Sequence, residues 1–179
     1  YNLGLLSSMS NQDFQNSTGD QILNLNFPNK IGVAGGLDKN ADYFHVLGKL
    51  GFGFVEVGTF TLKPQSGNPK PRVHRFTKEK NIVNSLGFNN VGVYQGLKNV
   101  ERNKLSFDGV LGISIGKSKE TKTINAYKDY LHLIDYVHDQ ADYIAINISS
   151  PNTENLRDLS SESYFSCLLY TSDAADEVL

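Results

Sequence analysis

Four stretches of this sequence change abruptly from apolar residues to glycine, amide, hydroxyl and ammonium groups. The polar groups read GGLDKN at 35–40, GTFT at 58–61, IGKSK at 115–119 and NISSPN at 147–152. Polar groups that follow a buried strand need hydrogen-bond partners, because an unpaired buried group costs a few kcal/mol. The stretches therefore predict a place where amides, hydroxyls and a lysine face a polar ligand.

A fifth polar group, NSLGFNN at 84–90, lies in the longest segment between the apolar runs. Its amides can hydrogen-bond a flat polar ring while Phe88 stacks on that ring or covers it. Turn formation by the same residues is an alternative explanation.

Each polar group also has a purely structural explanation. Gly35 and Gly36 can form a tight turn into a helix that has Asp38 as its N-cap. Lys39 would then lie in the first helical turn, where a cation opposes the helix dipole unless an anion binds there. Asx and serine turns explain two of the four polar residues in the last group, but not all four.

The apolar runs have the length and the β-branched composition of strands. The expected strands are 31–34, 54–57, 110–115 and 143–148, and the expected helices are 40–50, 91–103 and 125–140. Strand and helix alternate, which predicts an α/β fold with βαβ crossovers and a parallel sheet. In a (β/α) barrel the loops that follow the strands meet at one mouth, where ligands bind. We therefore expect the polar groups to line such a mouth.

Two segments lie outside this alternation. Residues 60–90 form an insertion that contains several prolines, and its length predicts a lid, a small hairpin or a binding loop. Residues 1–28 are polar apart from an apolar patch at 3–6 and a strand-like run, ILNLNF, at 22–27. They predict the end of a preceding element and a hairpin at the base of the domain.

Neither the histidines nor the carboxylate within the second strand indicate a metal site. The histidines share no ligand spacing with carboxylates or with the cysteine, so we expect surface histidines and no metal. They are His45, His74, His132 and His138. Glu56 alternates with Val55 and Val57, so we expect it to point into the barrel as a structural carboxylate with a cationic partner.

The composition excludes several classes of protein. Of the 179 residues, 39% are hydrophobic, which is enough for the core of one domain. The 17 lysines and arginines against 19 acidic residues give a net charge of −2, and their scatter indicates no nucleic-acid surface. No apolar run approaches the roughly 18 residues of a membrane span. The single cysteine, Cys167, excludes an internal disulfide framework and favours a reducing compartment.

The two ends of the sequence suggest a fragment with an added tail. The chain begins with Tyr1, and residues 167–177 resemble the translation of a sequencing adapter, without capping or periodic pattern. We therefore expect three parts. These are an N-terminal segment with the base hairpin at 1–28, a half-barrel at 29–165, and a non-native tail at 166–179.

The polar groups and their neighbours resemble a known family, the quinone-dependent (class 2) dihydroorotate dehydrogenases. The resemblance rests on five motifs in order: GGLDKNA, EVGTFTLKPQSGNPKPRVHRF, NSLGFNNVGV, GVLGISIGKSK and AINISSPNTENLRDL. It covers roughly residues 29–160, and the joint pattern is far more specific than any single motif. It implies a (β/α)8 TIM barrel, of which roughly the first four βα units are present. It also implies oxidation of dihydroorotate to orotate in pyrimidine biosynthesis, with flavin mononucleotide (FMN) as hydride acceptor and a quinone as final acceptor.

The resemblance further assigns roles to residues of this chain. The cofactor-binding residues would be Gly35, Gly36, Leu37, Asp38, Lys39, Thr59, Ser114 and Asn147. The substrate-binding residues would be Lys39, Asn84, Ser85, Leu86, Gly87, Phe88, Asn147 and Asn152. Ser150 would be the catalytic base, and Arg75 would lie near the flavin edge and the quinone entrance. Serine is a poor base in water and can serve only in a closed, dry pocket. Family members that use soluble acceptors have a cysteine here, so Ser150 favours the quinone-linked branch.

Some residues depart from the family pattern. Ser114 stands where the family usually has an asparagine that bonds the flavin, and Gly35 stands where alanine is common. Glu154 and Asn155 replace a small or glycine-bearing pair. The second half of the barrel, with its phosphate site, is absent, so we expect that the chain alone neither folds stably nor binds flavin.

The resemblance also bears on location and on other functions. Class 2 members sit on the membrane through an N-terminal helical pair, of which residues 1–10 would be the remnant. This implies peripheral association with the cytoplasmic face of the inner membrane if the source is bacterial. The same motifs also fit a related FMN barrel that acts on another dihydropyrimidine, or a non-catalytic flavin- or pyrimidine-binding barrel. The sequence does not set the oligomeric state.

Overall fold

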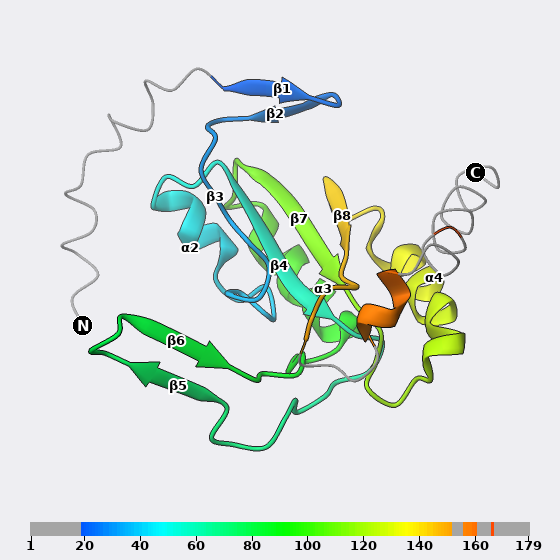
Figure 1. Ribbon diagram of the computed structural model, residues 1–179. Helices are drawn as coiled ribbons and strands as arrows, with labels where there is room; N and C mark the ends of the chain where they lie inside the picture. Colours follow the sequence, from blue (N-terminus) through cyan, green and yellow to red (C-terminus); the bar gives the residue numbers. More distant parts are fainter. Residues whose placement is uncertain (1–18, 152–155, 161–165, 167–179) are drawn as a thin grey trace.

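A parallel sheet of four strands forms the centre of the molecule (Figure 1). The structure is a computed structural model that describes residues 19–151, 156–160 and 166. In spatial order the strands are β3 (Gly32–Val33), β4 (Phe54–Phe60), β7 (Val110–Ile115) and β8 (Tyr143–Ile146). Chain order and spatial order agree, and each neighbouring pair is parallel. This is the arrangement of the first four strands of a (β/α) barrel, and it confirms the predicted α/β class.

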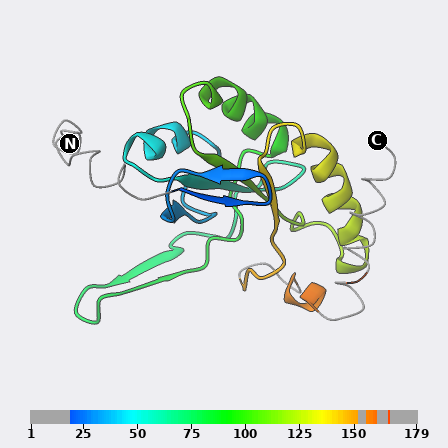
Figure 2. The same cartoon turned by 90° about the horizontal axis from the view of Figure 1, so that it is seen from above.

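Helices connect the strands and lie in an arc on one side of the sheet (Figure 2). They are α2 (Phe44–Lys49), α3 (Val93–Lys104) and α4 (Ala126–Val137), with short 3₁₀ helices η2 (Thr123–Asn125) and η3 (Leu156–Ser160). The positions of α3 and α4 agree with the prediction to within a few residues. The predicted start of α2 at residue 40 is wrong, because Asp38 holds residues 42 and 43 in a loop and the helix begins at Phe44.

The core lies between the helices and the side of the sheet that faces them. All six residues of β7 are buried, and so are Val55 and Val57 of β4, while Glu56 is half-buried on the other side. From α4, Tyr130, Leu133 and Val137 complete this layer. Each buried large apolar side chain contributes roughly 1.5–3 kcal/mol. This layer therefore fixes the strand ends from which the polar loops emerge.

A hairpin lies at the end of the sheet where β4 begins (Figure 1). Its strands are β1 (Asp20–Ile22) and β2 (Leu25–Phe27), which pair antiparallel. The Phe27 ring packs edge-on against Phe54, with ring centroids 5.5 Å apart, in agreement with the hairpin expected at the base. The strand-like run predicted at 22–27 is interrupted, because Leu23 and Asn24 form the turn with φ values of 48° and 63°. Two-residue hairpin turns need this left-handed conformation.

The long insertion between β4 and α3 forms a second hairpin. Its strands are β5 (Val73–Phe76) and β6 (Asn81–Asn84), and an isolated bridge between Gln65 and Asn90 closes its base. All eight strand residues are exposed, and the hairpin projects from the body in both views (Figures 1 and 2). The expectation of a small hairpin in this insertion is confirmed. Among the described residues, none belongs to a helix long and apolar enough to span a membrane.

Candidate functional site

Residues from four loops line one cavity of about 330 Å³ at the edge where the parallel strands end. The loops are the β3–α2 connection, the end of β4, the insertion after β6 and the segment that follows β8. The lining residues are Gly35, Gly36, Lys39, Thr59, Asn84, Leu86, Gly87, Phe88, Asn89, Asn147, Ser149, Ser150 and Pro151. The predicted convergence of polar groups at a barrel mouth is therefore present in the structure.

Some predicted site residues do not line this cavity. Leu37 is 69% exposed, whereas Asp38 and Ser114 are buried beside the cavity or beneath it. Ser85 and Arg75 are exposed residues of the insertion. Asn152 lies outside the described residues. A larger cavity of about 510 Å³ lies at the opposite end of the strands, between the segments that lead into β4 and β7, and contains no predicted site residue.

The loops that follow β3 and β4 are hydrogen-bonded to each other. Gly36 N–H donates to Gly58 O at 2.9 Å, and Gly58 N–H donates to Asp38 O at 2.9 Å. Gly36 and Gly58 have φ values of +99° and +97°, which favour glycine. The two loops therefore form one backbone platform at the floor of the cavity.

Asp38 shapes the first loop from inside. It is 3% exposed, and its carboxylate accepts hydrogen bonds from Asp42 N–H at 2.9 Å and from Tyr43 N–H at 2.8 Å. The prediction that Asp38 is the N-cap of this helix is therefore wrong. Tyr43 occupies the N-cap of α2, and Asp38 closes the loop before it. The carboxylate therefore binds backbone N–H groups and does not line the cavity.

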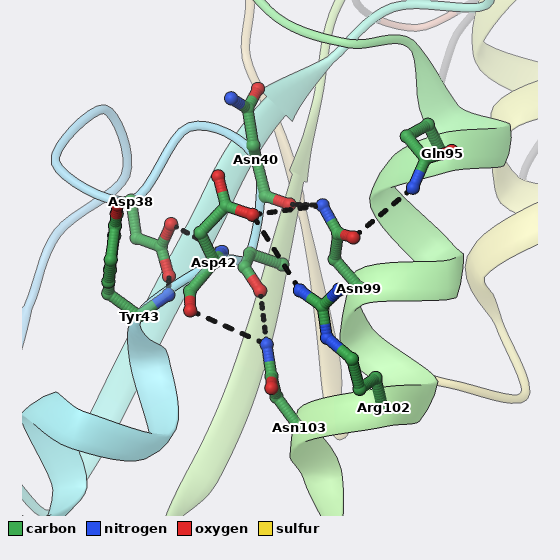
Figure 3. Close-up of polar contacts among 9 residues, drawn as sticks. Asp38, Asn40, Asp42, Tyr43, Gln95, Asn99, Arg102 and Asn103 are labelled. Atoms are coloured by element: carbon green, nitrogen blue, oxygen red, sulfur yellow. Dashed lines mark hydrogen bonds and ion pairs between the residues drawn. The ribbon is translucent and has the colours of Figure 1, made fainter.

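Two buried amides of α3 hold the same loop from the other side (Figure 3). Asn99 Nδ2 donates to Asn40 O at 2.9 Å, and Asn103 Nδ2 donates to Ala41 O at 3.0 Å. Asn99 and Asn103 are 6% and 8% exposed. We call this pair, together with Asp38, the loop clamp. We did not predict these two asparagines from the sequence, although their spacing of four residues on a helix places them on one face.

Lys39 follows Asp38 and enters the cavity. Its ammonium group donates to Gly36 O. Burial lowers the pKa of Lys39, and the positive charge of Arg72 lowers it further. Lys39 lies in the clamped loop and not in a first helical turn, so the helix-dipole argument from the sequence does not apply. An anion in the cavity would offset both causes of the lowered pKa.

Thr59 and Asn147, which line the cavity, form a chain of polar side chains with Ser114, which is buried beneath them. Thr59 Oγ1 lies 3.0 Å from Ser114 Oγ and accepts a hydrogen bond from Asn147 Nδ2 at 3.1 Å. The register of β4 and β7 shifts between Gly58 and Phe60, which leaves Thr59 as an extra residue in a β-bulge. Bulges redirect side chains, and this one brings Thr59 to the cavity.

In the amide-rich loop at 84–90, some residues form turns and others line the cavity. Asn90 is buried and ties the loop together, donating to Phe88 O at 2.8 Å and accepting from Gly92 N–H at 2.8 Å. Asn84, Phe88 and Asn89 line the cavity. The buried Oδ1 atom of Asn89 has no hydrogen-bond partner among the described residues. Asn89 was not among the predicted site residues, although it belongs to the amide-rich motif.

The segment after β8 delivers Ser150 and Asn147 to the cavity. Asn147 Oδ1 accepts from Ser149 N–H at 3.3 Å, which is the Asx turn considered in the structural explanation. Asn147 O accepts from the Tyr130 hydroxyl at 3.0 Å, and burial raises the pKa of Tyr130. Ser150 is half-buried and lines the cavity. Turn formation and ligand contact therefore coexist in this segment.

Glu56 has a different partner from the one predicted. The Tyr143 hydroxyl, on β8, donates to Glu56 Oε2 at 3.4 Å, so the partner is a phenol rather than a cation. Burial raises the pKa of Tyr143 to about 12, and the negative charge of Glu56 and the hydrogen bond add to the shift. The pair sits on the inward side of the sheet and is structural. Within the part of the chain that the structure describes, no group of three His, Cys, Asp or Glu residues could hold a metal ion.

Comparison with known proteins shows which family has this arrangement. The family model for dihydroorotate dehydrogenase matches residues 18–176. A protein from Teredinibacter turnerae named dihydroorotate dehydrogenase (quinone) is 55% identical over 139 residues, which are 78% of this chain and 40% of that protein. One of the same name from Acinetobacter baylyi is 52% identical over 149 residues, or 83% of this chain and 44% of that protein.

Solved structures agree with this match. A crystal structure of ligand-free DHODH from Eimeria tenella superposes with a TM-score of 0.80 at 39% identity, covering 90% of this chain and 46% of that one. The chain spans less than half the length of the curated relatives it matches, from 40% to 49% of each. On these grounds the chain belongs to the dihydroorotate dehydrogenase family.

Proposed function

We propose that this chain supplies the first half of the active site of a quinone-dependent dihydroorotate dehydrogenase. The proposed enzyme oxidises dihydroorotate to orotate in pyrimidine biosynthesis, with FMN as hydride acceptor and a quinone as final acceptor. The observation that supports this most is the meeting of Lys39, Asn84 and Ser150 on one cavity of a chain that belongs to the family. The activity is that of the complete barrel, of which these residues form one side.

The floor of the cavity fits a flavin ring. The ring is flat and bears carbonyl oxygens and ring nitrogens, which need donors. Lys39 Nζ and the Thr59 hydroxyl offer such donors, and Asn147 lies beside them. Gly35 and Gly36 add no side chain to the floor, so a ring can approach the backbone. We assign these five residues to FMN, with Leu37, Asp38 and Ser114 supporting them from outside the cavity.

When bound, FMN supplies the hydride acceptor, and the protein supplies orientation and charge. Asn84 and Asn147, with Asn152, would hydrogen-bond the N–H and C=O groups of the pyrimidine ring. Ser85, Leu86 and Gly87 shape the substrate loop, and Phe88 covers the ring. The Asn89 Oδ1 atom, buried without a partner among the described residues, fits a ligand that bears N–H groups. Lys39 would pair with the substrate carboxylate and with negative charge that develops during proton loss.

Ser150 is the proposed base that accepts the proton from C5 of dihydroorotate, while the hydride leaves C6. A serine hydroxyl can do this only where water is excluded and its own proton passes to a neighbouring hydroxyl or water. The half-buried position of Ser150 in the cavity wall supports this role. Closure of the pocket depends on the Asn84–Phe88 side of the insertion.

The quinone would approach along the insertion hairpin. Arg75 lies on β5 opposite Ile82 of β6, and both are exposed. Val73 and Phe76 are exposed as well, at 44% and 48%. A surface that mixes apolar and basic side chains suits a lipid-soluble acceptor. We include in the proposal that the enzyme, if its source is bacterial, associates peripherally with the cytoplasmic face of the inner membrane.

The test uses a complete barrel. Residues 29–160 of this chain replace the corresponding segment of the Teredinibacter turnerae relative; we call this protein the barrel chimera. Dihydroorotate should bleach the visible absorption of its bound FMN, and dihydrouracil should not. Ser150→Ala should keep FMN and lose most of the bleaching rate, by about 100-fold or more.

Ser106→Ala is the matched control, because Ser106 lies at the opposite end of the strands, beside the larger cavity. It should leave the bleaching rate unchanged. Bleaching by dihydrouracil instead of dihydroorotate, or an unchanged rate in Ser150→Ala, would overturn the proposed function. A barrel chimera that folds cooperatively without binding FMN would overturn it too.

A further inference from the structure

We propose that Ser114 is a positioning residue that fixes the direction of the Thr59 hydroxyl proton, so that Thr59 donates a hydrogen bond into the cavity. The inference rests on the proposed function, because the acceptor is assigned to the flavin. Ser114, Thr59 and Asn147 come from three neighbouring strands, β7, β4 and the end of β8. Ser114 is 1% exposed and cannot reach a ligand itself.

The direction of the first hydrogen bond follows from a backbone group. Ser149 N–H can only donate, and it points at Asn147 Oδ1 at 3.3 Å. The other end of the Asn147 carboxamide, Nδ2, therefore faces Thr59 Oγ1 at 3.1 Å. Because Nδ2 is a donor, Thr59 must be the acceptor in this bond.

The second bond is then decided by counting hydroxyl protons. Thr59 Oγ1 and Ser114 Oγ are 3.0 Å apart, so one of their two protons lies between them. The other proton needs an acceptor, and among the described residues neither hydroxyl has a further hydrogen-bond partner. If Thr59 donated to Ser114, the Ser114 proton would be left unpaired in a fully buried place, which is costly.

The opposite direction leaves no buried group unpaired. Ser114 then donates to Thr59, and Thr59 accepts from both Ser114 and Asn147, which fills its two lone pairs. Its own proton is left to point into the cavity that Thr59 lines. The ligand atom it meets must be an acceptor, such as a carbonyl oxygen or an unprotonated ring nitrogen of the flavin.

The role of Ser114 is thus indirect. Without its hydroxyl, Thr59 regains a free lone pair and its proton can rotate away from the ligand. The bound flavin would keep its place and lose one well-directed hydrogen bond. A single hydrogen bond of this kind changes a dissociation constant by about 3- to 10-fold.

A double-mutant cycle in the barrel chimera tests the coupling, with the FMN dissociation constant read from quenching of flavin fluorescence. Ser114→Ala alone should weaken FMN binding about 3- to 10-fold. In a Thr59→Val background, where there is no hydroxyl to direct, Ser114→Ala should change the constant by less than about 1.5-fold. In a Thr59→Ser background, which keeps the hydroxyl, the full effect of Ser114→Ala should return.

A merely structural Ser114 predicts another pattern. Ser114→Ala would then weaken FMN binding by the same factor in all three backgrounds, or leave it unchanged in all three, and either result would overturn the inference. Bleaching of the unmutated barrel chimera by dihydroorotate is measured alongside. Loss of the coupling with bleaching intact refutes the role of Ser114 alone, whereas absence of bleaching refutes the proposed function.

Discussion

The two sides of the cavity are built in opposite ways. On one side, the loop that bears Lys39 is held by the loop clamp, whose members Asp38, Asn99 and Asn103 are all less than 10% exposed. On the other side, Asn84 ends a hairpin whose eight strand residues are all exposed. The first side is fixed by buried hydrogen bonds that need no ligand, whereas the strands of the hairpin on the second side bury none of their residues.

A site built in this way can hold one group in a fixed position and still admit a ligand. Buried hydrogen bonds keep a loop in one conformation, which favours a preorganised electrostatic group such as Lys39. An exposed hairpin with few buried contacts opens at low free-energy cost, as binding loops and lids generally do. A ligand in the cavity would therefore meet a fixed lysine on one side and, on the other, Asn84 at the end of a hairpin that opens more easily.

The largest expected effect is that of Asp38→Ala, which removes the centre of the loop clamp. Two backbone N–H groups lose a charged acceptor, and we expect the free energy of unfolding of the barrel chimera to fall by about 3 kcal/mol. Urea unfolding measures the change. Asp108→Ala, at an exposed carboxylate on the far end of the strands, is the control. A loss below about 1 kcal/mol would show that the loop does not depend on this carboxylate.

A smaller loss is expected for Asn103→Ala. The substitution leaves the carbonyl oxygen of Ala41, a residue that is 0% exposed, without its amide donor. We expect the free energy of unfolding to fall by about 1–2 kcal/mol. Glu101→Ala, at an exposed position of the same helix, should cost less than about 0.5 kcal/mol. Equal effects of the two substitutions would remove the distinction between clamp and surface.

On the hairpin, Ile82→Ala should change the free energy of unfolding by no more than about 0.5 kcal/mol, because Ile82 is 59% exposed. The same urea measurement applies. A loss above about 1 kcal/mol would mean that the hairpin is packed in the barrel chimera, and the contrast between the two sides would then fail.

The smallest effect joins the two sides: burial lowers the pKa of Lys39, and the positive charge of Arg72, at the base of the hairpin, lowers it further. A lysine with a lowered pKa binds fewer protons in the folded state than in the unfolded state. Stability should therefore rise with pH between the lowered pKa and the ordinary lysine value of about 10.4. Lys39→Met should flatten this slope, and Arg72→Gln should reduce it. Thermal melting at a series of pH values measures this slope. An unchanged slope in both variants would contradict the assignment of the pKa shift to Lys39 and Arg72.

Much of this arrangement could be predicted from sequence because periodic apolar runs fix the order of elements. The predicted strand 110–115 coincides with β7, whose residues are buried on both faces. The start of α2 could not be predicted, since a single carboxylate, Asp38, bonds two backbone groups instead of capping a helix. Helical propensity does not reveal such a contact.

The site, too, could be predicted from the sequence only in part. The motifs placed Lys39, Thr59 and Asn147 at neighbouring strand ends, and the structure brings them to one cavity. The contact between Thr59 and Ser114 depends on a one-residue bulge in the β4–β7 register, and no periodicity in the sequence marks that bulge. Asn99 and Asn103 resemble surface amides until the loop they bind is placed against them.

The reciprocal bonds between Gly36, Gly58 and Asp38 have a mechanical consequence. Because the loop after β3 and the end of β4 are hydrogen-bonded to each other in both directions, a displacement of Lys39 by a bound anion would also shift the neighbouring Thr59. Nuclear magnetic relaxation of the Gly36 and Gly58 amides should then report one shared motion.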